Sequence, residues 1–266
     1  MTRRAILILF VLVLFLFSAE ILLAQTSQVA GSAAASNIKG AIVVFGVIGI
    51  IVFLIAKSSK KAEQDKEKRY KQLALKLNLR FYQKDTIGLS RHLEGTSLAM
   101  ESSEPSPYLS NIFVHSDSGG NSYIFHRIHF TYDFYHTVYL YQANQYFEAD
   151  LIIRPRGQTL MGRILRNREG KDLKEITAGN NQAFNDHFVV YADRADAAKN
   201  LIRQEVQEYY LANKGKFLKP CEVFTLIDKN NLMIFVQHNN GPKDFDNNEE
   251  LEQFILLAQG LKNKLI

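Results

Sequence analysis

The sequence predicts an α+β fold, in which a mostly antiparallel sheet packs with helices and follows one or two N-terminal transmembrane or signal helices. Three observations support this prediction. Two apolar segments fill the first 56 residues, strand-like stretches crowd the middle of the chain, and two amphipathic helices stand in its last third. Strands and helices in separate runs are typical of an α+β domain, not of an alternating α/β domain.

Composition narrows the class of protein. The chain has 266 residues, of which 47% are hydrophobic, and its net charge is +5. Basic residues are not interleaved with stacking aromatics, so no nucleic-acid partner is expected. The single cysteine, Cys221, excludes a disulfide within one chain, and we expect it to be a small buried residue. The chain shows no cofactor motif and no paired cysteine ligands, so neither a cofactor nor a metal is expected.

Residues 1–24 form the first apolar segment. Arg3 and Arg4 precede an apolar run from Ala5 to Phe17, and Ala24 is a small residue at a potential cleavage point. This order is that of a secretory signal peptide. An uncleaved first transmembrane helix is the alternative. Residues 25–39 are expected to be external in both cases, as a loop between two helices if the first segment is kept and as a short N-terminus if it is cleaved.

Gly40–Ala56 form the second apolar segment, which carries no charge. Its length is near the lower limit for crossing about 30 Å of hydrocarbon, and Lys39 and Lys57 can extend it because long cationic side chains reach the interface. A buried core helix is the alternative, but such a helix would show a polar stripe. We therefore expect a transmembrane helix over residues 40–56.

Flanking charges predict the orientation of this helix. Residues 57–77 are expected to form a basic juxtamembrane helix, whereas residues 25–39 carry only Lys39. Basic flanks face the cytoplasm, so the soluble α+β domain, residues 78–266, is expected on the cytoplasmic side of the cell inner membrane. The basic residues can serve as this topological signal alone, or they can also bind an anionic leaflet. They are Lys57, Lys60, Lys61, Lys66, Lys68, Arg69, Lys71 and Lys76.

The soluble part begins with a stretch, residues 78–115, that is expected to be mostly irregular, with a short helix in TIGLSRHLEG. Strands rich in Tyr, Phe, Ile and Val follow, and short connections predict an antiparallel meander. These strands are NIFVH, NSYIFHRIHFTYD, YHTVYLYQA and FEADLIIRP.

The later elements are expected in a fixed order along the chain. A short helix in TLMGRILRN and two strands, DLKEITAG and HFVVYAD, precede one long helix over residues 194–215. Apolar residues at helical spacing predict this helix. A hairpin around DKNN and a closing helix over residues 247–266 complete the domain, the helix having acids at its start and lysines at its end.

Three of these stretches carry a resemblance. FEADLIIRPRG, FNDHFVVYADRADAAKNLI and the hairpin VFTLIDKNNLMIFV, with the terminal helix, resemble a family of uncharacterised bacterial membrane-anchored proteins. The resemblance covers roughly residues 60–266. It implies one or two N-terminal spans, a charged helix and an α+β domain of unknown function. It implies no catalytic residue.

Histidines provide one candidate for chemistry. His126 and His129 are three residues apart, and on a strand such residues point to opposite faces, so they cannot share a metal ion unless the strand is bulged. A cluster would also need His115 and His136 from neighbouring strands. Half-exposed histidines on aromatic-rich strands are the alternative interpretation.

A run of arginines provides the second candidate. Guanidinium groups at this density can bind phosphates or lipid headgroups. A solvated surface paired with its own acids, such as Glu169, Asp172 and Glu175, is the alternative. The candidate anion- or lipid-binding residues are Arg154, Arg156, Arg163, Arg166 and Arg168.

These features favour a membrane-anchored protein that presents a cytoplasmic binding or scaffold domain to a protein partner or an anionic lipid surface. We expect no enzymatic activity. One alternative is a membrane-tethered hydrolase or metal-dependent enzyme with a site around the four histidines. Another is a structural subunit of a membrane complex, which a large exposed apolar patch would favour.

Overall fold

The computed structural model describes residues 34–93, 108–129, 134–157, 173–217, 223–238 and 248–266. The chain divides into two units, residues 1–68 and 69–266, and each is described by itself. The predicted signal or first transmembrane segment, residues 1–24, lies outside the described residues. The short helix predicted in TLMGRILRN also lies outside them, as does Cys221.

The first unit contributes most of α2, which spans Ala34–Lys76. From Val47 to Ile55 this helix exposes large hydrophobic side chains, among them Phe53 at 65%. Among the described residues, no helix is both long enough and apolar enough to cross a membrane. The side chains of residues 40–46 and of Ile48, which belong to the predicted span, lie outside the described part.

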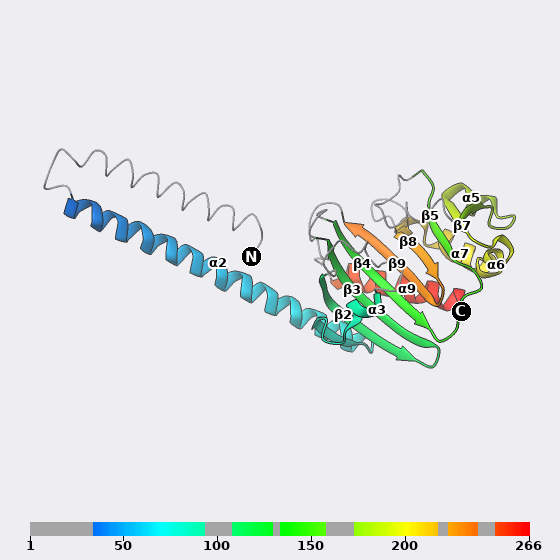
Figure 1. Cartoon of the computed structure of the whole chain (residues 1–266), viewed down its shortest axis with the longest axis horizontal. Helices are drawn as coiled ribbons and strands as arrows, with labels where there is room; N and C mark the ends of the chain where they lie inside the picture. The colour runs from blue at the N-terminus through cyan, green and yellow to red at the C-terminus, as the bar shows by residue number, and fades with distance from the viewer. Residues whose placement is uncertain (1–33, 94–107, 130–133, 158–172, 218–222, 239–247) are drawn as a thin grey trace. The chain divides into compact units, whose positions relative to one another are not determined.

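The second unit is built on one antiparallel sheet, which confirms the predicted α+β architecture (Figure 1). Within the described residues the sheet has nine strands in the order β1-β2-β3-β4-β9-β8-β5-β7-β6. The strands are β1 (Arg80–Lys84), β2 (Tyr108–Asp117), β3 (Gly120–His129), β4 (Phe134–Ala143), β5 (Leu151–Pro155), β6 (Lys174–Ile176), β7 (Phe188–Ala192), β8 (Val223–Asp228) and β9 (Asn231–His238).

The turn between β2 and β3 forms where the SDSGG stretch predicts it. Oδ1 of Asp117 accepts hydrogen bonds from the backbone N–H groups of Gly119, at 2.8 Å, and Gly120, at 3.0 Å. A Cβ at residue 120 would collide with the backbone carbonyl of Gln142 on β4. Glycine is therefore required there so that the neighbouring strand can approach.

The meander prediction is correct for β2, β3 and β4 and wrong for the next strand. The hairpin of β8 and β9 inserts between β4 and β5, so that β4 pairs with β9 and β5 pairs with β8. The connection after β4 crosses the β8–β9 turn and is held there by Asp150, whose Oδ1 accepts from Lys229 N–H at 2.8 Å. Lys229 adopts φ 58°, which allows the tight turn. The start of the soluble domain, from residue 78, was expected to be mostly irregular. This was also wrong, since β1 forms there and pairs with β2.

The helix predicted over residues 194–215 is broken into three pieces. These are α6 (Ala195–Leu201), α7 (Gln204–Ala212) and α8 (Lys214–Phe217). The first break falls at Ile202, which is buried, and at Arg203, whose ψ of 168° is extended. The side chain of Gln207 donates a hydrogen bond to the Ile202 carbonyl at 2.7 Å. This carbonyl stands at the break, where the interrupted helix supplies no backbone donor for it.

Each face of the sheet is buried. One face packs against the last turns of α2, together with α5 (Gln182–His187), α7 and α9 (Asn248–Leu265). The other carries a second cluster that includes Phe125, Val138 and Phe235 and is covered in part by α3 (Leu89–Leu93), the helix predicted in TIGLSRHLEG. Because both faces are apolar, strand residues alternate between two cores and not between core and solvent.

The end of α2 is a structural part of the second unit. Tyr70, Leu73 and Ala74 are each no more than 3% exposed and belong to the core on the helix-covered face. Lys76 forms an ion pair with Glu252 of α9, with Nζ and Oε1 at 2.6 Å. The last two turns of α2 are therefore needed to complete the α+β domain.

Candidate functional site

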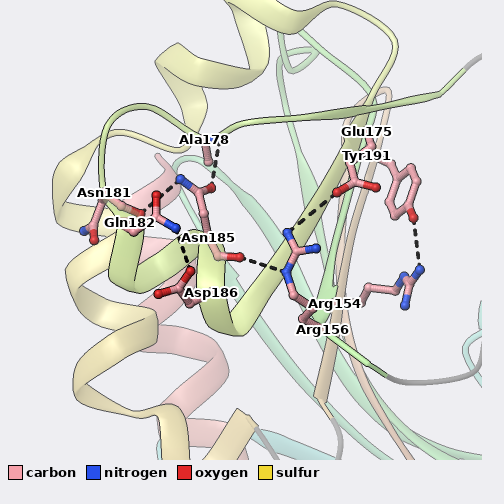
Figure 2. Close-up of polar contacts among 9 residues, drawn as sticks. All are labelled: Arg154, Arg156, Glu175, Ala178, Asn181, Gln182, Asn185, Asp186 and Tyr191. Atoms are coloured by element: carbon pink, nitrogen blue, oxygen red, sulfur yellow. Dashed lines mark hydrogen bonds and ion pairs between the residues drawn. The ribbon is translucent and has the colours of Figure 1, made fainter.

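The two described members of the arginine run lie at the end of β5. Arg154 belongs to this strand, and Arg156 directly follows its last residue, Pro155. Arg154 donates through Nη2 to the hydroxyl of Tyr191 at 3.0 Å, and its guanidinium carbon lies 5.3 Å from the centre of the same ring (Figure 2). Tyr191 belongs to β7, the neighbour of β5, so this contact lies between adjacent strands.

Arg156 makes its contacts with α5 and β6. Its Nε donates to the backbone carbonyl of Asn185 at 2.9 Å, and Nη2 lies 3.6 Å from Oε1 of Glu175 (Figure 2). Glu175 is one of the three acids that the alternative interpretation names as partners of the run. The other two, Glu169 and Asp172, lie outside the described residues.

The acceptor for Arg156 is positioned by the start of α5. Asn181 caps this helix through a hydrogen bond from Phe184 N–H to its Oδ1 at 3.2 Å. The side chain of Asn185 accepts from the backbone of Ala178 at 3.2 Å (Figure 2). These amides fix the helix against the preceding loop, so the carbonyl of Asn185 faces Arg156 in a defined orientation.

Both guanidinium groups thus take part in contacts within the domain. The side chain of Arg156 is 47% exposed, so part of its charge faces solvent. Arg163, Arg166 and Arg168 lie outside the described residues. The anion-binding role of the run stays a prediction.

The described histidines are spread over both faces of the sheet. His126 stacks on Tyr70 of α2 with ring centres 6.1 Å apart, which places it on the helix-covered face. His136 packs against Phe235 at 5.9 Å on the opposite face. His115 pairs with Ser122, four residues along β3 from His126. The side chain of His129 lies outside the described part.

Metal chemistry has no assembled site in the described part of the chain. There, no group of three or more His, Cys, Asp and Glu residues could hold a metal ion.

Two tyrosines in the core on the helix-covered face of the sheet have raised pKa values. Burial raises the pKa of Tyr139 to about 12 and also raises the pKa of Tyr210, because the charged phenolate would be desolvated. Both act as neutral hydrogen-bonding groups near pH 7.

The charge contact that sequence reasoning missed joins α9 to the β2–β3 turn. Lys262 Nζ lies 2.8 Å from Oδ2 of Asp117 and 4.5 Å from the centre of the Tyr141 ring. Lys262 is only 15% exposed in its side chain. The lysines at the end of α9 are visible in the sequence as a match to the helix dipole, but nothing in their spacing selects Lys262 as the partner of Asp117.

A second basic surface lies on α2 directly after the exposed apolar residues. Lys57, Lys60 and Lys61 are exposed. The first acid after them is Glu63, followed by Asp65. The sequence predicted a basic stretch here but did not separate these three lysines from the mixed charges that follow them.

Comparison with known proteins finds a family model that is similar to part of the chain and a solved structure whose fold is similar to most of it. Residues 133–257 match the family model described as "Protein of unknown function (DUF3137)". No curated protein matches the chain. Among solved structures, the crystal structure of the mycobacterial trehalose monomycolate transport factor A, TtfA, is similar, with a TM-score of 0.50 at 12% identity. That match covers 74% of this chain and 93% of the TtfA chain. Residues 133–257 are therefore similar to the DUF3137 family, whose function is unknown, and the α+β fold resembles that of TtfA.

Proposed function

We propose that this chain is an integral inner-membrane protein whose second unit is a binding or scaffold domain on the cytoplasmic side. Its partner is a protein or an anionic lipid surface. The observation that carries the proposal is the exposure of the apolar part of α2. Six large hydrophobic side chains there are between 48% and 65% exposed, namely Val47, Ile50, Ile51, Phe53, Leu54 and Ile55.

The distribution of these side chains supports a lipid covering. Every residue from Ile50 to Ala56 is apolar, and successive helical residues are 100° apart, so apolar side chains surround the helix. A helix that packs on a protein core buries one stripe and keeps a polar stripe. An apolar surface on every side of a helix fits the interior of a bilayer.

The flanking charges support the orientation. Lys57, Lys60 and Lys61 follow the apolar residues directly, and positive flanks remain on the cytoplasmic side. The second unit begins at Arg69 and follows on the same helix. The proposal therefore places the α+β domain in the cytoplasm.

A binding role is supported by the fold and by the contacts of the candidate residues. TtfA is named as a transport factor, which fits a non-catalytic use of this fold. The alternative of a hydrolase or metal-dependent enzyme requires the histidines to converge. His126 and His136 project from opposite faces of the sheet, so this alternative receives no support from the described part of the chain.

Membrane integration is tested by washing membranes from a bacterial host that expresses the full chain with alkaline carbonate. We expect the wild-type chain to stay in the membrane pellet. A variant with Ile51→Lys and Leu54→Lys should be released or degraded, because charges at these positions oppose insertion. Leu75→Lys is the matched control, since Leu75 is 81% exposed on the same helix but lies in the second unit. Release of the wild-type chain by carbonate would overturn the proposal.

The nature of the partner is tested separately on residues 69–266, which lack the apolar segment and the first lysines of α2. Salt-sensitive binding to anionic vesicles that is lost in Arg163→Ala, Arg166→Ala and Arg168→Ala would support a lipid surface contacted by the arginine run. No binding would leave a protein partner, which crosslinking of the full chain in native membranes would identify.

A further inference from the structure

We infer that Lys57, Lys60 and Lys61 form a contact surface for acidic phospholipid headgroups at the cytoplasmic interface. This inference rests on the proposed membrane anchoring and names the lipid class that would surround the anchor. It assigns the first lipid contact to α2 and not to the arginine run over residues 154–168.

The three lysines share one face of α2 with an exposed apolar residue. Phe53 is 65% exposed, and positions four, seven and eight residues after it hold Lys57, Lys60 and Lys61. Residues at these spacings lie on one side of an α-helix. This side of the helix therefore changes from apolar to cationic within about two turns, as an acidic lipid does from acyl chain to headgroup.

Their position along the helix axis matches the headgroup layer. The polar layer of each leaflet is about 5–8 Å thick, and a helix rises 1.5 Å per residue, so about four or five residues fall within this layer. If the apolar run ends at Ala56, the residues in this layer are 57–61. These residues include three lysines and no acid, whereas Glu63 and Asp65 follow beyond it.

Three other cations of the described part are already engaged with acids in the second unit. Arg156 faces Glu175, Lys76 binds Glu252 and Lys262 binds Asp117. The three lysines at the start of the basic stretch are instead exposed on a single helix. Lysine ammonium groups on flexible stems suit mobile phosphates, because they bind as point charges without a fixed geometry.

The size of the effect can be stated as a ratio of affinities. A cation close to an anionic membrane surface changes binding by about fivefold. Part of this is screened by salt, because the lysines face solvent. We expect the full chain to prefer phosphatidylglycerol over phosphatidylcholine at this surface by at least about fivefold at low salt.

The test uses the full chain with Phe53→Trp, reconstituted in vesicles. The chain has no natural tryptophan, so the introduced indole is the only one, and it lies one turn before Lys57. Its fluorescence is quenched by brominated lipids that touch the helix. Brominated phosphatidylcholine and brominated phosphatidylglycerol are each mixed with unlabelled phosphatidylcholine at the same fraction.

Stronger quenching by brominated phosphatidylglycerol, which declines as salt is added, is the expected result. It should disappear when Lys57→Gln, Lys60→Gln and Lys61→Gln are combined. The control is Lys199→Gln with Lys214→Gln and Lys216→Gln, which removes the same charge from exposed lysines of the second unit and should leave the preference intact.

The outcomes separate this inference from the proposal on which it rests. If neither brominated lipid quenches the indole, the helix is not in the bilayer and the anchoring proposal fails. If both quench equally, anchoring stands and the inference is overturned. It is also overturned if the preference for phosphatidylglycerol survives in the triple variant at positions 57, 60 and 61.

Discussion

Lys262 and Asp117 form an ion pair that joins the last turns of α9 to the β2–β3 turn, 145 residues away in the sequence. The nitrogen–oxygen distance is 2.8 Å, and the ammonium group also lies over the ring of Tyr141. The hydrogen bond from Lys262, with those from Gly119 and Gly120, holds the pKa of the Asp117 carboxyl below its ordinary value of 3.8. This pair fixes the closing helix to the sheet meander.

Replacing Lys262 with Met should destabilise the second unit. The variant loses a partly buried ion pair and a cation–π contact, which together contribute about 1 kcal/mol to the free energy of unfolding. This corresponds to a decrease in Tm of about 2–4 °C for a domain of this size. Thermal unfolding of the detergent-solubilised full chain, followed by near-ultraviolet circular dichroism of the tyrosines, measures it. Lys264→Met is the control because Lys264 is exposed on the same turn. Equal Tm values for the two variants would contradict this account.

Asp117→Asn should destabilise the domain in a pH-dependent way. The folded-state pKa of Asp117 is lowered, so the contribution of its charge to stability is fully present above about pH 4 and is lost as the pH falls through the folded-state value. The difference in unfolding free energy between wild type and variant should therefore be largest near neutral pH and shrink at acidic pH. Denaturant titrations across this range measure the difference, and one that grows on acidification would refute the assignment.

The hydrogen bond from the Tyr210 hydroxyl to Thr225 Oγ1, at 2.6 Å, is buried between α7 and β8. Tyr210→Phe should cost about 1–2 kcal/mol because it leaves the threonine hydroxyl without its donor. Thr225→Val should cost a similar amount. The double variant should cost less than the sum, since both polar groups are then removed. Strict additivity in this cycle of denaturation measurements would show that the two hydroxyls do not interact.

Tyr70→Ala should be the most damaging single change at the end of α2. Tyr70 is 2% exposed and packs edge-on against Phe81 and Phe113. Removing a buried aromatic side chain costs about 3–5 kcal/mol. Leu75→Ala should change stability by less than about 0.5 kcal/mol because Leu75 is exposed on the same helix. Comparable losses for both would mean that α2 is not part of the core.

Local sequence patterns predicted those helices, strands and turns whose formation depends on residues close together in the sequence. The β8–β9 hairpin, the closing helix and the turn before Gly120 all follow from apolar periodicity or turn residues close in sequence. The order of the sheet did not follow from such patterns. Its determinants include Asp150 bonding to Lys229, a contact between residues 79 positions apart. The break at Ile202 was missed for the same reason, because burial in the tertiary structure outweighs helical periodicity there.

The candidate site was predictable as a group of residues but not as a geometry. The sequence named Arg154, Arg156 and the nearby acid Glu175, and the structure places the last two 3.6 Å apart. The sequence could not predict that Arg154 donates a hydrogen bond to the Tyr191 hydroxyl, or that Arg156 donates one to the Asn185 carbonyl. Tertiary folding alone brings β7 and α5 next to the end of β5. The alternation rule predicts that His126 and His129 point to opposite faces of the sheet, and this stays a prediction because the side chain of His129 lies outside the described part.

Chemical labelling of one exposed residue tests the central claim most directly, that the α+β domain lies in the cytoplasm on a membrane anchor. Tyr146 is 77% exposed in the second unit, and a full chain with Cys221→Ser and Tyr146→Cys has a single thiol there. Spheroplasts of a bacterial host are treated with a membrane-impermeant maleimide before and after permeabilisation. The account predicts labelling only after permeabilisation, with the chain retained in carbonate-washed membranes. Labelling of intact spheroplasts would contradict it.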